Sequence, residues 1–140
     1  MTPHYVSRDI AASPAAVWSI LTDATRLSDG TFSIIRIEGQ IALNKSFKLW
    51  SEVDPKRPFP IKVAIMQPER QMEWHGGMPL GLFLGNRQFR LNPTATGTRF
   101  MMQETYAGPL KRLITRFIPD LQPSFEKFAD ALKTAAEAQA

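Results

Sequence analysis

The sequence predicts an α+β fold: a curved antiparallel sheet of about seven strands that wraps around a long C-terminal helix, with two short helices after the first strand. Two observations lead to this prediction. Of seven strand-like segments, six follow one another after the two short helices, and consecutive strands joined by short turns pair antiparallel. After Gly108-Pro109, apolar residues recur at helical spacing, and such a helix must bury its apolar stripe against the sheet.

The composition fits one domain that spans residues 1–140. Apolar residues make up 44% of the chain and charged residues 21%, which is ordinary for a globular domain. Because the chain has no cysteine, disulfides, thiolate metal sites and cysteine nucleophiles are excluded. The net charge of +4 is mild, and no basic arm or aromatic–basic pattern indicates nucleic-acid binding. No apolar run reaches the roughly 20 residues of a membrane span, so we expect a cytoplasmic protein with no integral membrane segment.

The first elements are predicted from a strand pattern and a helix start. A strand is expected over residues 5–11, with weak alternation. Ser13 and Pro14 then begin a helix, because serine caps helix N-termini and proline suits the first helical position. A second short helix or turn is predicted over residues 24–28, where Asp29-Gly30 breaks it.

The remaining strands are predicted from alternating apolar and polar side chains. They cover residues 32–38, 46–53, 61–67, 70–75, 86–92 and 98–106. Residues 54–60 are predicted to be a loop, because three prolines fall there and proline cannot donate to a strand ladder. Residues 76–85 are predicted to be a flexible loop, either a lid or a plain cover. It contains four glycines and apolar residues expected to be exposed, namely Leu80, Leu82, Phe83 and Leu84.

The C-terminal region is predicted to be helical with one interruption. Its apolar stripe consists of Leu110, Leu113, Ile114, Phe117, Leu121, Phe125, Phe128 and Leu132. Pro119 and Pro123 fall inside this pattern, and a proline within a helix removes a hydrogen bond and clashes one turn back. We therefore predict a kink or break near residues 118–122 and a regular helix over about residues 121–136.

Two groups of motifs resemble the START-like helix-grip superfamily (SRPBCC), in particular its polyketide cyclase/dehydrase-like branch. The first is Ile-Ala-Ala-Ser-Pro-Ala-Ala-Val-Trp-Ser-Ile-Leu-Thr-Asp at residues 10–23, where a strand leads into a helix. The second is Gly-Asn-Arg-Gln-Phe-Arg-Leu-Asn-Pro at residues 85–93, followed by Gly-Thr-Arg-Phe at 97–100 and Glu-Thr-Tyr-Ala-Gly at 104–108. The resemblance covers nearly the whole chain. It implies a seven-stranded sheet that grips the C-terminal helix, with a cavity between them.

Aromatic and methionine side chains are numerous for a sheet that one helix covers. Residues of these types commonly fill a close-packed core, but the resemblance implies that part of them line the cavity, and the two interpretations are compatible. The predicted ligand-binding residues are Trp50, Met66, Trp74, Phe83, Arg87, Phe89, Phe100, Met102, Glu104, Phe117, Leu121, Phe125 and Phe128.

Two charged residues are predicted to face the same apolar interior. Arg87 shares a strand face with Phe89, and Glu104 shares one with Met102 on the next strand. A buried charge is costly unless it is paired, so Arg87 and Glu104 are expected to meet. The pair is either a structural ion pair or a device that orients a polar group of a ligand. In the second case Glu104 or Arg87 is a candidate acid/base group.

Histidine offers a third catalytic candidate. His75 ends a strand before a glycine pair, and an imidazole titrates near neutral pH. Because Met72 and Trp74 share one strand face, His75 and Glu73 are predicted to point to the other. His4 is predicted to be solvated. No cluster of histidines and carboxylates has metal-ligand spacing, so we expect no metal and no cofactor.

A basic face is predicted where the C-terminal helical region begins. Lys111, Arg112 and Arg116 lie beside Leu113 and Phe117 in the sequence. This face is either an ordinary solvated surface or a contact for a membrane surface or an acidic partner.

Three functions are compatible with these observations. The first is a binding module that carries or senses a small hydrophobic molecule. The second is an enzyme, a cyclase, dehydratase or hydrolase that acts on an aromatic or polyketide-like substrate. The third is a co-chaperone or ribosome-associated interaction domain, which would work through a protein partner at its outer surface. Fold alone does not decide among them, and whether any reaction is catalysed stays open.

Overall fold

The computed structural model describes residues 4–139, so residues 1–3 and 140 of the predicted domain lie outside the described part. The elements in chain order are β1 (His4–Ile10), α1 (Pro14–Leu21), α2 (Ala24–Leu27), β2 (Ile34–Glu38), β3 (Ser46–Ser51), β4 (Asp54–Gln67), β5 (Gln71–Met78), the 3-10 turn η1 (Pro79–Gly81), β6 (Phe83–Thr94), β7 (Gly97–Ala107), α3 (Lys111–Thr115) and α4 (Gln122–Gln139). The predicted α+β class is confirmed.

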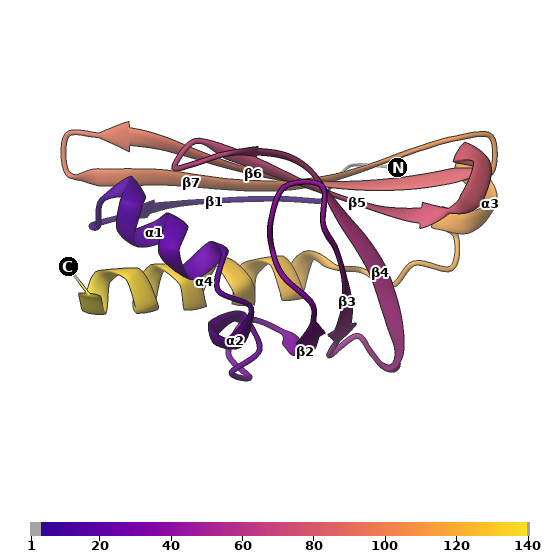
Figure 1. Ribbon diagram of the computed structural model, residues 1–140, viewed down its shortest axis with the longest axis horizontal. Helices are drawn as coiled ribbons and strands as arrows, with labels where there is room; N and C mark the ends of the chain where they lie inside the picture. The colour runs from indigo at the N-terminus through magenta and orange to yellow at the C-terminus, as the bar shows by residue number, and fades with distance from the viewer. Residues whose placement is uncertain (1–3, 140) are drawn as a thin grey trace.

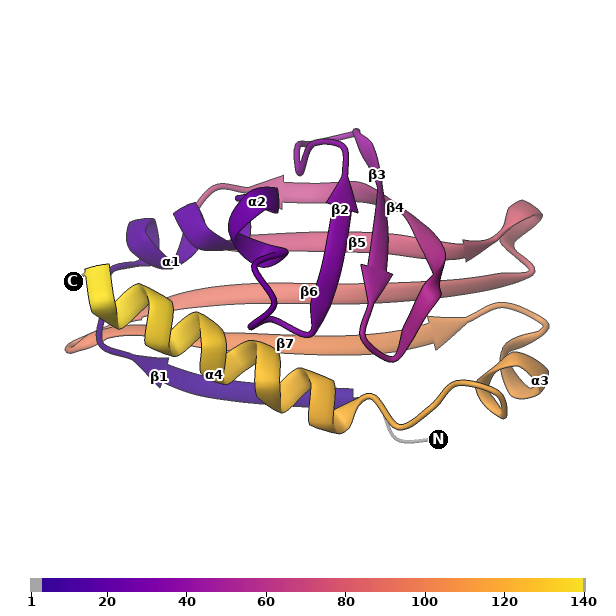
Figure 2. The same ribbon diagram turned by 90° about the horizontal axis from the view of Figure 1, so that it is seen from below.

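All seven strands belong to one antiparallel sheet in the order β1-β7-β6-β5-β4-β3-β2. Figure 1 shows β1, β5, β6 and β7 in one layer above α4, whereas β2, β3 and β4 turn down beside the helix. Figure 2 shows α4 running across the concave face that this curvature creates. The sheet therefore wraps the C-terminal helix as the sequence predicts.

The core lies between the concave face and α4. The buried residues of α4 are Phe125, Phe128, Ala129, Leu132 and Ala136, which recur at helical spacing. The Phe128 ring lies 5.3, 6.0 and 6.3 Å from the rings of Phe32, Phe89 and Phe100, measured between centroids. Burying one such side chain stabilises a fold by roughly 1.5–3 kcal/mol, so this aromatic cluster is a main source of stability.

Polar contacts fasten α4 to the edge strand β1. Arg8 pairs with Glu126 and also with Asp130, whose Oδ1 lies 2.8 Å from Arg8 Nε. Lys133 Nζ donates a hydrogen bond to the Asp9 carbonyl oxygen at 2.6 Å. These contacts join two segments that lie at opposite ends of the described chain.

The start of α1 follows the predicted capping pattern. Ser13 is extended, and its Oγ accepts a hydrogen bond from the backbone N–H of Ala16 at 3.2 Å. Pro14 occupies the first turn, where a missing N–H costs nothing.

Replacing Ser13 with alanine is expected to lower the free energy of unfolding by about 1 kcal/mol, because the Ala16 N–H loses its acceptor. Chemical denaturation measures the change. The matched control is Ser19→Ala in the same helix, whose Oγ only donates to the Ala16 carbonyl oxygen, and no loss is expected there. Equal losses in both variants would contradict the capping role.

The predicted loop over residues 54–60 is wrong, because these residues form the first half of β4. Pro60 pairs with Lys48 of β3, whereas β5 pairs with β4 only from Lys62 onward. Proline cannot donate a hydrogen bond, but this half of β4 has a ladder partner on one side alone, so the missing donor costs little.

The predicted flexible loop over residues 76–85 is also wrong for most of its length. β5 continues to Met78, and β6 begins at Phe83 after the tight turn η1. Gly77 has φ 142°, and a Cβ there would lie 2.2 Å from the Phe83 carbonyl oxygen, so glycine is required for the two strands to approach. Phe83, predicted to be exposed, is buried.

The predicted interruption of the C-terminal helical region is confirmed. α3 ends at Thr115 and α4 begins at Gln122, so the break contains Pro119. Across residues 4–139, no helix combines the length and the hydropathy that crossing a bilayer requires.

Candidate ligand cavity

A cavity of about 850 Å³ lies between the concave face of the sheet and the C-terminal segment. Its wall is built by residues from β2 to β7, by residues 114–121 and by the first half of α4. Phe59 and Phe117 line it and are 41% and 78% exposed, so the cavity reaches the surface between β4 and the segment after α3. Its volume falls in the range of roughly 300–1,000 Å³ that is typical of small-molecule pockets.

Most of the predicted ligand-binding residues lie on this wall. They are Trp74, Phe83, Arg87, Met102, Glu104, Phe117, Leu121, Phe125 and Phe128. They come from β5, β6, β7, α4 and the segment before α4, and the alternation of the strands brings them to one face. Their role in binding stays a prediction.

Four predicted ligand-binding residues lie outside the cavity wall: Trp50, Met66, Phe89 and Phe100. Trp50 pairs across β2 and β3 with Arg36, whose guanidinium lies 5.0 Å above its ring. Phe89 and Phe100 are buried, and the Phe128 ring packs against both of their rings. They therefore belong to the packed core. Met66 packs against that core beyond a register shift in β4, away from the cavity.

His75 also lies outside the cavity. Its Nε2 is 3.2 Å from Glu73 Oε1, and the side chains of Asn86 and Gln88 donate to the same carboxylate at 3.1 and 3.5 Å. Burial alone would raise the pKa of Glu73, but these hydrogen bonds hold it below its ordinary value. The cluster is a polar network away from the cavity wall.

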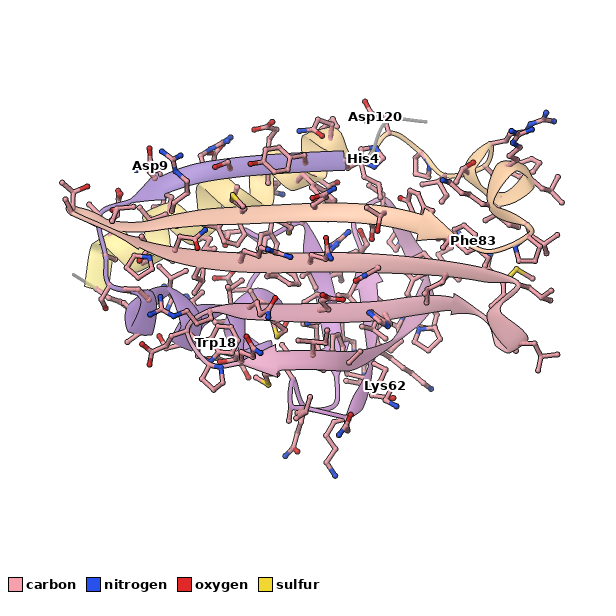
Figure 3. All side chains as sticks on the ribbon, turned by 90° about the horizontal axis from the view of Figure 1, so that it is seen from above. His4, Asp9, Trp18, Lys62, Phe83 and Asp120 are labelled. Atoms are coloured by element: carbon pink, nitrogen blue, oxygen red, sulfur yellow. The ribbon has the colours of Figure 1, made fainter. Side chains whose placement is uncertain are left out.

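The prediction that His4 is solvated is wrong. His4 is only 8% exposed, and Figure 3 shows it at the end of β1 beside Asp120. Its Nε2 accepts a hydrogen bond from the Leu121 N–H at 3.3 Å and lies 3.4 Å from Asp120 Oδ1. His4 therefore holds the segment whose residue Leu121 forms part of the cavity wall. Within residues 4–139, no three histidine or carboxylate side chains gather as metal ligands would.

Arg87, Glu104 and Tyr106 form a polar cluster on the mainly apolar cavity wall. Arg87 and Glu104 face each other across β6 and β7, with 3.4 Å between Arg87 Nη2 and Glu104 Oε1, so the expected meeting of the two charges is confirmed. The hydroxyl of Tyr106 donates to Glu104 Oε2 at 3.1 Å. The Arg87 guanidinium lies 4.8 Å above the Phe125 ring, a cation–π contact that joins the cluster to α4.

The cluster is neutral overall and partly shielded. The side chains of Arg87 and Glu104 are 21% and 14% exposed, and their charges cancel. Burial, together with the nearby charge of Glu104, raises the pKa of Tyr106 above its ordinary value. Tyr106 therefore stays a hydroxyl donor at physiological pH, and the guanidinium supplies further donors.

Trp74 is held in place by contacts of its indole ring with two phenylalanine rings. Phe47 and Phe89 contact the indole edge-on, with centroids 5.1 and 4.7 Å away. The indole Nε1 is buried and has no hydrogen-bond partner among the described residues. A buried donor without an acceptor costs about 1–3 kcal/mol, so aromatic packing must outweigh that cost to hold Trp74 on the wall.

The sequence-based list missed several parts of the wall, including residues 32–34, residues 76–78, residues 57–60 and Tyr106. Tyr106 lies two residues from Glu104 on the same strand face, so the alternation contained the signal. Residues 57–60 form a wall through β4 and carried no such signal, because their prolines predicted a loop.

The chain matches a family model described as "Polyketide cyclase / dehydrase and lipid transport" over residues 1–137.

Solved structures share the fold at low sequence identity. Protein MLL2253 from Mesorhizobium loti superposes with a TM-score of 0.76 at 16% identity, with 99% of each chain covered. Protein NE0264 from Nitrosomonas europaea gives 0.75 at 16% identity, over 98% of this chain and 95% of that one. DynU16, a protein in the dynemicin biosynthetic locus, gives 0.69 at 15% identity, and this chain spans 48% of its length. No curated protein matches the sequence. Identities this low establish a common fold and nothing finer.

Proposed function

Because the chain belongs to the polyketide cyclase/dehydrase and lipid transport family, we propose that it binds a small hydrophobic molecule in the cavity between its sheet and its C-terminal helix. The resemblance to the START-like helix-grip superfamily is thereby confirmed. The observation that carries the proposal is a cavity of about 850 Å³ with a mainly apolar wall. Protein interiors normally pack to crystal density, so a cavity of this size between sheet and helix, open to the surface, suits the binding of a small molecule.

The polar cluster supports a ligand with one uncharged polar group. Arg87 offers N–H donors, and Glu104 and the Tyr106 oxygen offer acceptors, because the one hydroxyl proton of Tyr106 is donated to Glu104; the sum of the charges is zero. A carboxylate on the ligand would compete with Glu104 for Arg87, whereas a hydroxyl or carbonyl can join the cluster without separating the ion pair. Trp74, Phe125 and the other rings of the wall suit a flat apolar body. The protein acts in this proposal as one binding domain of residues 1–140 in the cytoplasm, because a chain without cysteine needs no oxidising compartment to fold.

An enzyme of the cyclase or dehydratase type is the second candidate. Glu104 Oε2 and Tyr106 Oη lie 3.1 Å apart on the cavity wall, one an acceptor and the other a donor. Such a pair suits proton removal next to a carbonyl group, with the tyrosine hydroxyl or the guanidinium stabilising the developing oxyanion. The interaction-domain alternative is less supported, because a filled core would favour it and a cavity of about 850 Å³ lies beside this core.

A ligand screen tests the proposal. Flavonoids, fatty acids, quinones and aromatic polyketides are added to labelled protein, and heteronuclear NMR shifts are followed. We expect a flat compound with a hydroxyl or carbonyl group to give saturable shifts at Trp74, Met102 and Phe125. No saturable shift from any class, or shifts confined to the outer face near His75, would count against cavity binding.

Glu104→Gln is expected to weaken binding of such a compound roughly tenfold, since a hydrogen bond to a charged group is worth about 1.5–3 kcal/mol. The matched control is Glu73→Gln, which alters a carboxylate with three side-chain partners on the outer network and should leave the affinity unchanged. Isothermal titration of both variants measures the difference. Turnover of the bound compound that Glu104→Gln abolishes would establish the enzyme candidate instead.

A further inference from the structure

Two segments that are distant in the sequence form one end of the molecule. η1, between β5 and β6, lies beside α3 at the end opposite the C-terminus (Figures 1 and 2). The Leu110 N–H donates to the Leu82 carbonyl oxygen at 3.0 Å, which joins the start of α3 to the turn. Gly108 lies so close that a Cβ would be 2.7 Å from the same oxygen. The turn and α3 therefore form one unit, which we call the tip (residues 78–84 and 110–117).

The tip presents large apolar side chains to solvent. Leu80, Phe117 and Leu113 are 96%, 78% and 52% exposed. Leu80 also has φ 61°, a left-handed conformation that favours glycine or asparagine over leucine. Single exposed apolar residues are ordinary, but several gathered at one end indicate an interaction surface.

The charge of the tip has one sign. α3 carries Lys111 and Arg112, and Arg116 follows it. None of these three forms an ion pair with any residue in the described part of the chain. The stretches of residues 74–103 and 105–119 contain no aspartate or glutamate at all. The tip is thus cationic and apolar at once.

We propose that the tip docks on an anionic membrane surface, with Leu80 and Phe117 inserted among the lipids and the three basic residues at the headgroups. Apolar side chains flanked by lysine and arginine are the chemistry that binds interfacial segments to acidic bilayers. A protruding turn with a leucine at its apex suits insertion into a fluid interface better than the broad, flat contact of a stable protein complex.

Docking at this place would set the cavity against the bilayer. Ile114 and Phe117 belong both to the tip and to the cavity wall, and Phe83, at the β6 end of the turn, lines the cavity as well. A hydrophobic molecule could then pass between membrane and cavity without crossing water. The docking itself does not depend on the proposed ligand binding, because the tip is complete with an empty cavity.

Vesicle flotation with the full chain tests the inference. We expect binding to phosphatidylcholine vesicles that contain phosphatidylglycerol, little binding to phosphatidylcholine alone, and a decline as salt is added. Leu80→Asn should weaken binding roughly tenfold while keeping the fold, because asparagine tolerates the left-handed conformation. Reversing Lys111, Arg112 and Arg116 to glutamate should weaken it roughly a hundredfold.

The matched controls change residues outside the tip. Leu43→Asn removes a leucine that is 49% exposed in the segment between β2 and β3, and Lys45→Glu reverses a nearby charge. Both should bind vesicles like the unaltered protein, and thermal melting checks that every variant is folded. Equal binding to neutral vesicles, unchanged binding of the tip variants, or no binding to any vesicle would overturn the proposal. Capture of an acidic protein by the tip without vesicle binding would also overturn it.

Discussion

Replacing Phe128 with alanine is expected to lower the free energy of unfolding by about 3–5 kcal/mol. Phe128 is 2% exposed, and its ring contacts those of Phe32, Phe89 and Phe100. Alanine would remove the ring that joins α4 to the sheet and to the segment before β2. Because one side of Phe128 already lines the cavity, the void left behind would merge with that cavity instead of closing.

Denaturant unfolding followed by circular dichroism measures this loss. Phe117→Ala is the matched control, because Phe117 belongs to the same predicted apolar stripe but is 78% exposed. A change within about 0.5 kcal/mol is expected for it. Similar losses in the two variants would show that the aromatic cluster around Phe128 is not a principal source of stability.

Arg87→Met is expected to destabilise the protein by about 2–3 kcal/mol, somewhat less than the 3–5 kcal/mol of a fully buried broken pair. The substitution removes the cation that pairs with Glu104. The Glu104 side chain, which is only 14% exposed, is then left as an unpaired charge on the cavity wall. It also removes the guanidinium from the Phe125 ring. Adding Glu104→Gln in the same chain should restore most of the lost stability, because the uncompensated charge disappears while Tyr106 keeps an acceptor.

The four chains of this double-mutant cycle are compared by denaturant unfolding. Arg99→Met serves as the surface control, since Arg99 pairs with Asp9 at 2.9 Å but the two side chains are 54% and 69% exposed. No measurable loss is expected there, because exposed ion pairs contribute little. Additive losses for Arg87→Met and Glu104→Gln would mean that the two residues are not coupled.

The order of elements could be predicted because local signals agree with the final fold. Ser13 caps α1 as its sequence context indicates, and the helical region breaks around Pro119. The first half of β4 could not be predicted, because the effect of a proline depends on whether a strand has neighbours on both sides. That is a property of the assembled sheet, in which β5 leaves residues 54–61 unpaired on one side.

The candidate site could be predicted to the extent that strand alternation assigns each side chain to one face of the sheet. The alternation of side chains along β6 and β7 was enough to predict that Arg87 and Glu104 meet. It could not decide whether an inward aromatic ring meets another side chain or empty space. Phe89 and Phe125 both face the interior, but only Phe125 lies where α4 leaves room beside the sheet. The prediction that His4 is solvated failed for a related reason. The segment that contacts His4 contains Leu121, which lies 117 residues away in the sequence.

The position of β1 at the edge of the sheet sets an order of events during synthesis on the ribosome. Its single ladder partner is β7, and Ile10 pairs with Thr98, so the first strand emerges long before anything it can pair with. The hairpins from β2 to β7 can form while β1 has no strand to pair with. The final closure brings in α4, whose Glu126, Asp130 and Lys133 hold β1 in place. A nascent chain that stops short of α4 therefore has an unanchored first strand and an uncovered aromatic face, the state in which chains of this kind are most prone to aggregate.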